Sequence, residues 1–294
     1  MKLSILTATY NRANFLPKLY ESIKENLKYN ITPEWIIVDD GSIDDTKNIV
    51  QSFKDENKVI IKYLYQNNSG KMAAINEAVK MATGDLMVDC DSDDYLVNNS
   101  FEIIENNAEK ILNNEKFYGL VFLKREENGK ISGKEFKQKE YITTMFDLYF
   151  KEDIGGEKIL VYNSKIRKMY SHQLEHNEKF ITEARMYHKM DEKYKLIAIN
   201  EVIEQGSYIE DGYTKNINKT FKSNPYGYYM YFKELLEKNM KGVKFSKRLY
   251  VIKHYILFSY LTGNKFNANV IKDLLNKFLY IILYLPGMMK SKRF

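Results

Sequence analysis

The sequence predicts an α/β fold in which a mostly parallel sheet is flanked by helices. Between residues 3 and 90, apolar runs of strand length alternate with segments whose apolar residues recur at helical spacing. Such alternation is typical of a parallel sheet. A polar cluster follows each apolar run, and the carboxyl ends of parallel strands meet at one edge of a sheet. We therefore expect these clusters to lie together and to form a ligand site.

The first part of the chain supplies the strands and helices of this pattern. We expect strands at residues 3–9, 35–38, 59–65 and 86–90. We expect helices at residues 15–27, from 44 or 45 to 53, and at 72–81. Asn14 is the expected N-cap of the first helix, and Pro17 fits its first turn. Trp35 is expected in the core.

The middle of the chain, from residue 101 to about 212, is less regular. We expect strands at 119–124, 159–161 and 196–202, a hairpin or loop at 126–133 and a turn at 208–214. A helix is expected from Glu183 to Met190, with Thr182 as its N-cap. From residue 221 onward the chain is predicted to be helical and basic, with clustered apolar residues at 249–261 and 270–285.

The composition is that of a soluble globular protein with room for a sizeable core. The chain has 294 residues, of which 44% are apolar and 29% are charged. Cys90 is the only cysteine, which excludes a disulfide framework and a cysteine-based zinc site. The opening stretch MKLSILTATYNR lacks the pattern of a signal peptide, so we expect no secretion signal there.

Charge is distributed unevenly along the chain. Residues 216–294 contain 15 Lys/Arg and 3 Asp/Glu, a net charge of +12, whereas the remainder has a net charge of −6. A basic end on an acidic body favours a polyanionic partner, either anionic lipid or nucleic acid. The longest uncharged run, 278–289, is too short to span a bilayer. It fits a helix lying in the membrane interface, or an ordinary helix packed on the body.

Four carboxylates lie at the end of the apolar run at 86–90. Asp89 is within the run, and Asp91, Asp93 and Asp94 follow it. On an extended chain Asp91 and Asp93 would point to the same side and repel each other. A divalent cation bound to a phosphate would relieve this repulsion, because magnesium is typically held by one or two carboxylates and substrate phosphates. The alternative is a plain turn with a helix cap, since Asp is common in both.

Two further clusters suit a nucleotide diphosphate. VDDGS at 38–42 places two carboxylates at a strand end, where they can accept hydrogen bonds from a base or a ribose. SGK at 69–71 places backbone amides and a lysine at a helix start, which suits a phosphate. The GxxxxGK[ST] and GxGxxG patterns are absent, which argues against a P-loop and a Rossmann dinucleotide site.

Taken together, the motifs resemble those of the GT-A-fold, family 2 glycosyltransferases, in particular enzymes of bacterial surface-polysaccharide synthesis. The resemblance rests on TYNR at 9–12, VDDGS followed by Asp44 and Thr46, NNSGKMAAINEAVKMATGD at 67–85 and DSDD at 91–94, and it covers residues 1–98. It implies inverting, metal-dependent transfer of a hexosyl or N-acetylhexosaminyl group from a nucleotide-diphospho-sugar, with a UDP-sugar as the expected donor.

The resemblance also implies roles for single residues. Asp93 would bind the metal, Mn²⁺ or Mg²⁺, together with Asp91, which would also face the ribose and the sugar, while Asp94 would support or cap the turn. The donor-binding residues would be Thr9 and Tyr10 at the base, Asp39 or Asp40 at the uracil or ribose, and Lys71 and Asn76 at the diphosphate and sugar.

The resemblance places the catalytic base at the start of a helix in the second half of the chain. Glu183 is the best match, although Ala184 stands where a second acid is common. Asp211, in the YIEDG segment, is the rival. The missing second acid leaves a non-catalytic sugar-nucleotide-binding subunit of a membrane complex as an alternative. A nucleotidyltransferase is disfavoured because TYNRANF at 9–15 contains no glycine.

The resemblance divides the chain into three parts. Residues 1–100 would bind the nucleotide-sugar, 101–215 would form the acceptor and catalytic half, and 216–294 would form a basic, amphipathic helical region. The expected acceptor is a glycan or a lipid-linked oligosaccharide. We expect a cytoplasmic protein at the inner face of the cell membrane, bound to anionic lipid rather than to nucleic acid.

The four histidines are not expected to take part in chemistry. His172 and His176 are four residues apart and could share a helix face, and we expect both at the surface. His188 and His254 are expected to be structural residues within helices.

Overall fold

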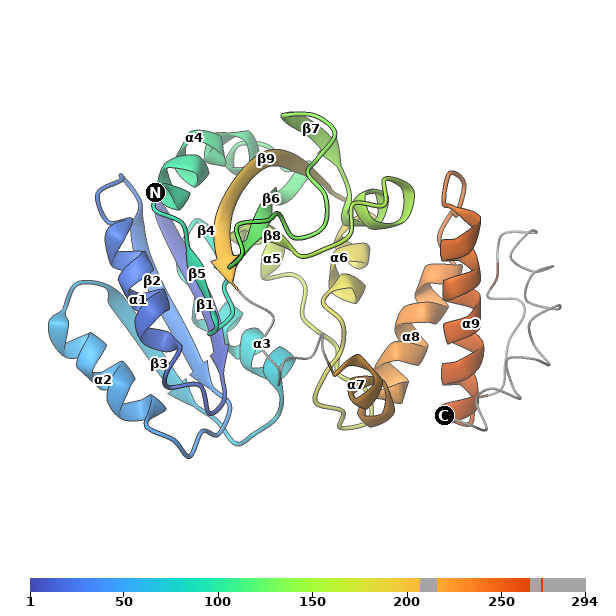
Figure 1. The fold of residues 1–294 in the computed structure, drawn as a ribbon, viewed down its shortest axis with the longest axis horizontal. Coiled ribbons are helices and arrows are strands. Elements are labelled where there is room, and N and C mark those ends of the chain that lie inside the picture. The colour runs from blue at the N-terminus through green and yellow to red at the C-terminus, as the bar shows by residue number, and fades with distance from the viewer. Residues whose placement is uncertain (207–215, 265–270, 272–294) are drawn as a thin grey trace.

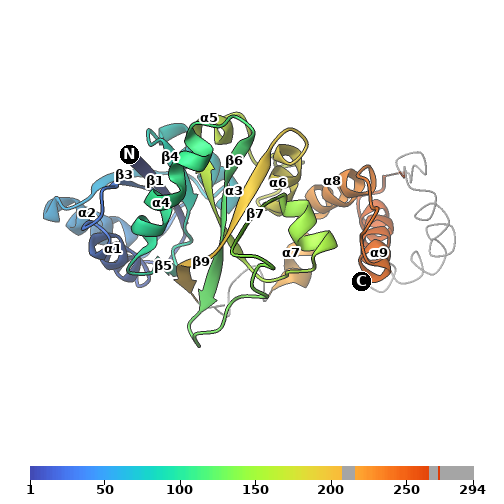
Figure 2. The ribbon, with the colours of Figure 1, turned by 90° about the horizontal axis from the view of Figure 1, so that it is seen from above.

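A computed structural model describes residues 1–206, 216–264 and 271 of the chain. This part of the chain forms a nine-stranded mixed sheet in the order β3-β2-β1-β4-β8-β6-β9-β5, with β7 paired to β9. Helices cover both faces of the sheet, and the C-terminal helices stand beside it (Figures 1 and 2). The predicted α/β class is therefore confirmed.

The first hundred residues form the parallel part of the sheet. Strands β1 (Lys2–Thr9), β2 (Thr32–Asp39), β3 (Ile60–Tyr65) and β4 (Leu86–Asp89) alternate with helices α1 (Leu16–Glu25), α2 (Thr46–Glu56) and α3 (Lys71–Met81). β1 pairs in parallel with β2 and β4, and β2 with β3. The N-cap of α1 is Phe15 rather than the predicted Asn14, and Pro17 lies in the first turn, where its missing N–H has no intrahelical partner to lose.

The remaining strands make the sheet mixed rather than mostly parallel. β8 (Lys158–Asn163) runs antiparallel to both β4 and β6 (Phe117–Glu126), and β6 is parallel to β9 (Lys195–Gly206). The short strands β5 (Asp94–Leu96) and β7 (Glu140–Thr143) are antiparallel to β9. The direction of β8 follows from pairings between segments about 70 residues apart in sequence, which no local pattern encodes.

Several elements of the middle segment were not predicted. These are α4 (Ser100–Leu112), β5, β7, a π-helix η1 (Asp147–Lys151) and the short α5 (Ser164–Arg167). For α4 the signal was present in the sequence, because Phe101, Ile104, Ala108 and Ile111 recur at helical spacing and are all buried. Helix α6 spans Ala184–Met190, close to the predicted segment.

Hydrophobic cores lie on both faces of the sheet. One packs α1, α2 and α4 against the sheet and contains Trp35, as predicted, and the other packs α3 and α6 against it. β1 and β2 are buried along almost their whole length because both of their faces are covered.

A third core holds the C-terminal helices to the body. It joins α7 (Ile217–Ser223), α8 (Pro225–Leu236) and α9 (Phe245–Leu261) to Phe146 and Phe150, which lie at η1. The run at 249–261 is therefore helical and packed against protein. Of the second apolar run, 270–285, only Ile271 lies within the described residues. None of the helices in the described ranges is long and apolar enough to cross a membrane.

Candidate active site

The four polar clusters meet at one edge of the sheet, as predicted. The N–H of Asn11, after β1, donates to Ser42 Oγ, after β2, over 2.9 Å. The loop after β3 is bound to β2 through Asp40, whose Oδ1 accepts from the N–H of Ser69 over 2.7 Å. Lys71, at the start of α3, reaches Asp91 beyond β4. Parallel strands place these loops together because their carboxyl ends share one edge.

The carboxylates after β4 lie on a turn and not on an extended chain, which corrects the prediction. β4 ends at Asp89, the N–H of Asp94 donates to the carbonyl of Asp91 over 3.0 Å, and β5 begins at Asp94. As expected, positive charge lies beside these carboxylates, and here it is contributed by side chains. Lys71 Nζ lies 2.8 Å from Asp91 Oδ1, and Arg12 Nη1 lies 3.1 Å from Asp93 Oδ1.

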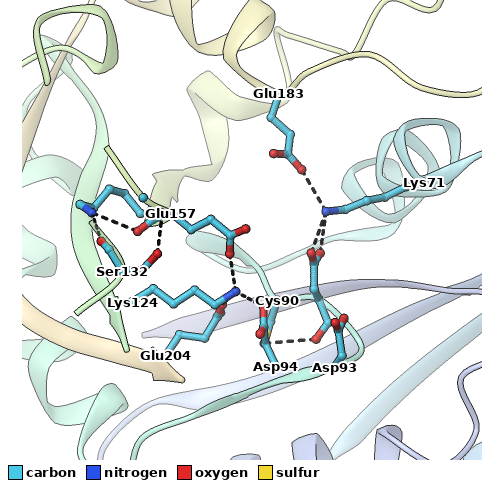
Figure 3. Close-up of polar contacts among 12 residues, drawn as sticks. Lys71, Cys90, Asp93, Asp94, Lys124, Ser132, Glu157, Glu183 and Glu204 are labelled. Atoms are coloured by element: carbon cyan, nitrogen blue, oxygen red, sulfur yellow. Dashed lines mark hydrogen bonds and ion pairs between the residues drawn. The ribbon is translucent and has the colours of Figure 1, made fainter. Parts of the chain in front are cut away.

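Lys71 joins the turn to the predicted base. Its Nζ lies 3.0 Å from Glu183 Oε1 as well as 2.8 Å from both oxygens of Asp91 (Figure 3). Burial works against the charge on Lys71, but the carboxylates of Asp91 and Glu183 outweigh it and hold the pKa of Lys71 well above its usual value. Lys71 therefore stays protonated between two carboxylates contributed by distant parts of the chain.

Glu183 itself is the N-cap residue of α6, in the place predicted for Thr182. Its side chain makes no capping hydrogen bond and extends toward Lys71 instead. A carboxylate that can accept a proton thus faces the polar edge of the sheet. Ala184 leaves no second acid beside it, and the rival Asp211 lies outside the described residues.

Asp39 and Asp40 shape the edge by binding its loops. Asp39 accepts from the N–H of Ser42 over 2.8 Å and from the hydroxyl of Tyr63 over 2.6 Å. Asp40 is 3% exposed, and its oxygens accept from the N–H groups of Ser69 and Gly70 and from a side-chain amide. These hydrogen bonds hold the 66–70 loop against the end of β2.

The remaining predicted donor residues differ in their surroundings. Thr9 is buried, and its Oγ1 has no hydrogen-bond partner within the described residues. Tyr10 is half exposed. Asn76 lies within α3 and uses both ends of its side-chain amide inside the protein. Its side chain donates to the carbonyl of His172 and accepts from the N–H of His172, each over 2.8 Å, so it clamps the segment that leads to Glu183.

Sequence reasoning missed a buried charged cluster behind the turn. Lys124 Nζ lies 2.6 Å from Asp94 Oδ2 and 2.6 Å from Glu157 Oε2, and Glu204 lies 4.0 Å away (Figure 3). Burial raises the pKa of Asp94 to about 7 although the charge of Lys124 lowers it, and burial also raises the pKa of Glu204. The sequence contains one indication of this cluster, because Lys124 ends the otherwise apolar strand expected at 119–124.

The histidines differ in their exposure to solvent. His172 is buried on an irregular segment rather than on a helix, which contradicts its predicted surface position, because Asn76 clamps its backbone to α3. Burial and the neighbouring Arg167 lower the pKa of His172. His176 is exposed. His188 is buried against Phe146 and Phe150, so its structural role is confirmed.

Comparison with known proteins identifies the family. The family model described as glycosyl transferase family 2 matches residues 4–155, more than half of the chain. An uncharacterized glycosyltransferase of Mycoplasma genitalium is 34% identical over 113 residues, which are 37% of this chain and 38% of that protein. The poly(ribitol-phosphate) β-N-acetylglucosaminyltransferase TarS of Staphylococcus aureus is 31% identical over 96 residues, 33% of this chain and 17% of TarS.

Solved structures share the fold over nearly the whole chain. TarS residues 1–349 match with a TM-score of 0.59 and 18% identity, covering 99% of this chain and 81% of that structure. A mannosyltransferase from Pyrobaculum calidifontis matches with a TM-score of 0.56 and 14% identity, covering 99% and 83%. At these identities the likeness supports the fold alone. From the match of the family model and the shared architecture, the chain belongs to glycosyl transferase family 2 and has a GT-A fold with a C-terminal helical extension.

Proposed function

We propose that the protein is an inverting glycosyltransferase. It would move a sugar from a nucleotide-diphospho-sugar, with a UDP-sugar as donor, to a glycan or lipid-linked acceptor in cell-surface polysaccharide synthesis. The observation that carries this proposal is the arrangement of Lys71 between Asp91 and Glu183 at the carboxyl edge of the sheet. It sets a cation for a diphosphate beside a carboxylate for an acceptor proton.

The donor site would lie along this edge. Lys71 is the first residue of α3, where N–H groups without intrahelical partners favour an anion. Thr9 and Tyr10 would flank the base, and Asp39 would help to shape the nucleotide site. TarS has been solved with UDP and with UDP-GlcNAc, which favours a uridine nucleotide, whereas the Pyrobaculum mannosyltransferase was solved with GDP-Man and Mn²⁺.

The residues of the turn fit a hard divalent cation. Asp93, together with Asp91, would offer carboxylate oxygens to Mn²⁺ or Mg²⁺, and the donor diphosphate would complete the coordination. No group of three or more metal-ligating His, Cys, Asp or Glu side chains occurs among the described residues. When bound, the metal would stabilise the charge of the leaving diphosphate.

Glu183 would act as the general base. The acceptor hydroxyl transfers its proton to the Glu183 carboxylate as its oxygen forms a bond to the anomeric carbon. The bond from that carbon to the diphosphate oxygen breaks on the opposite face, and the diphosphate leaves with the electron pair. In the donor-free protein Lys71 neutralises Glu183. A bound diphosphate would attract Lys71 and release the Glu183 carboxylate from this ion pair.

The test is turnover of a panel of UDP-sugars with Mn²⁺, with water or a glycan as acceptor. Glu183→Gln should lower turnover by roughly 10²–10⁴-fold and leave UDP binding unchanged. Glu77→Gln, on the exposed side of α3 where Glu77 pairs with Lys80, is the matched control and should keep full turnover. A wild-type protein that neither binds nor turns over any donor would refute the proposal.

The absence of an acid at position 184 keeps a second candidate open. A non-catalytic sugar-nucleotide-binding subunit of a membrane glycan-assembly complex would bind UDP without turnover. In that case the wild type and Glu183→Gln would bind UDP equally well and be equally inactive, even with the full complex present.

We further propose a division of labour along the chain, with donor binding by residues 1–100, acceptor binding and catalysis by 101–215, and membrane attachment by 216–294. Phe245, Tyr250 and Tyr260 of α9 are 42–55% exposed in a region with a net charge of +12. Exposed aromatic and basic residues suit anionic lipid at the cytoplasmic face of a membrane. Deletion of residues 270–294 should release the protein from anionic vesicles and leave UDP binding intact. Unchanged vesicle binding would contradict this attachment.

A further inference from the structure

The segment that leads to Glu183 is bonded to the start of α8. The buried carboxylate of Glu178 accepts from the N–H groups of Tyr226 and Gly227, each over 2.7 Å. The first N–H groups of a helix have no partner within it, and a negative charge there is favourable. Glu178, on the segment that leads to Glu183, therefore places a negative charge at the N-terminus of α8.

The contact is reciprocal. Asn224, the buried N-cap residue of α8, uses its Oδ1 to accept from the N–H groups of Lys179 and Phe180, over 3.1 and 3.0 Å. A Cβ at Gly227 would lie only 2.7 Å from Ile181 Cδ1. Four hydrogen bonds and close packing thus join residues 178–181 to residues 224–227.

The same segment also touches the donor loop. A Cβ at Gly70 would lie 1.8 Å from the carbonyl oxygen of Lys179, so the two backbones are in direct contact. Lys179 Nζ donates to Asn68 Oδ1 over 2.6 Å. Lys71 follows this loop and Glu183 follows this segment, and their charged groups are 3.0 Å apart.

We propose that Glu178 and Asn224 couple the C-terminal helices to the active site. Glu178 is a positioning residue that holds residues 178–181 between α8 and the donor loop, so that Glu183 faces Lys71. The proposal rests on the assignment of Glu183 as the base. A displacement of about 1 Å in a reacting group costs on the order of 100-fold in rate. Binding of a partner to α7–α9 would then change the position of Glu183 relative to Lys71.

The experiment compares Glu178→Gln with Glu192→Gln. The first substitution keeps the size of the side chain but places an amide donor against an N–H donor. Glu192 pairs with Lys238 of the C-terminal region over 3.2 Å and, among the described residues, makes no hydrogen bond or ion pair with residues 178–181, so it is the matched control. Glu178→Gln should lower kcat by 10- to 100-fold. Donor KM should change by less than about threefold, because Asp40 holds the donor loop independently.

Hydrogen exchange tests the coupling without turnover. In Glu178→Gln, amide exchange should accelerate at residues 179–187 as well as at 226–227, and it should stay unchanged at 66–71. If Glu178→Gln does not fold, Asn224→Ala removes the reciprocal bonds and should give the same pattern. Faster exchange confined to 226–227, or a wild-type kcat, would overturn the proposal. An inactive wild type with the expected exchange pattern would instead overturn the assigned chemistry and leave the coupling supported.

Discussion

Replacing Lys124 by Met tests the buried charged cluster behind the acidic turn. Lys124 Nζ contacts Asp94 and Glu157 at 2.6 Å, and Glu204 lies 4.0 Å away. Methionine has a similar length and no charge. The substitution therefore leaves the buried carboxyls of Asp94 and Glu204 without their cation, while the fold of β6 is otherwise undisturbed.

The size of the effect follows from burial and should depend on pH. Removing one partner of a buried ion pair costs about 3–5 kcal/mol. In the wild type, burial raises the pKa of Asp94 to about 7 even with Lys124 opposing it, so the loss of Lys124 raises this pKa further. A carboxyl whose folded pKa exceeds its unfolded value loses stability as pH rises, by about 1.4 kcal/mol per unit. For Asp94 this loss ends near pH 7 in the wild type and continues above pH 7 in the variant.

We therefore expect Lys124→Met to lose about 3–5 kcal/mol at pH 8.5 and about 2 kcal/mol less at pH 7. Urea denaturation followed by circular dichroism at both pH values measures the difference. Lys80→Met, at an exposed lysine of α3, is the control and should stay within about 0.5 kcal/mol of the wild type. A loss of equal size at both pH values, or below about 1 kcal/mol, would refute the reasoning.

Three further predictions concern single positions. Burial lowers the pKa of His188 to about 3, below its unfolded value, so the wild type should lose about 2 kcal/mol of stability between pH 6.5 and 5. His188→Phe should remove this slope in denaturation curves, and an unchanged slope would count against a buried neutral ring. Gly70→Ala, at φ 97° and against the carbonyl of Lys179, should weaken UDP binding at least tenfold by calorimetry. Gly129→Ala, which has a similar φ but open space for a Cβ, should not, and equal binding by the two variants would contradict the contact. Asp93→Asn should abolish the enhancement of UDP binding by Mn²⁺ and leave metal-free binding unchanged, whereas an intact enhancement would place the metal elsewhere.

The first hundred residues were predictable because their information is local. Strand-length apolar runs and helical periodicity fix the alternation of β1–β4 with α1–α3. Parallel strands bring their carboxyl ends to one edge, so the meeting of TYNR, VDDGS, NNSGK and DSDD followed from order alone. One local feature of this part of the chain differs from the prediction. Asp91 and Asp93 lie on a turn, because Asp94 begins a strand that pairs with β9 more than 100 residues later.

The sequence by itself therefore determined the fold class, the edge that carries the candidate site, and the residue types that gather there. Only the tertiary structure decided which of them face one another. It bound Asn76 to the backbone of His172, placed Lys71 between Asp91 and Glu183, and set Glu178 at the start of α8. These outcomes depend on contacts between segments 20 to about 110 residues apart, whose geometry is set by packing and hydrogen bonding and not by any local period.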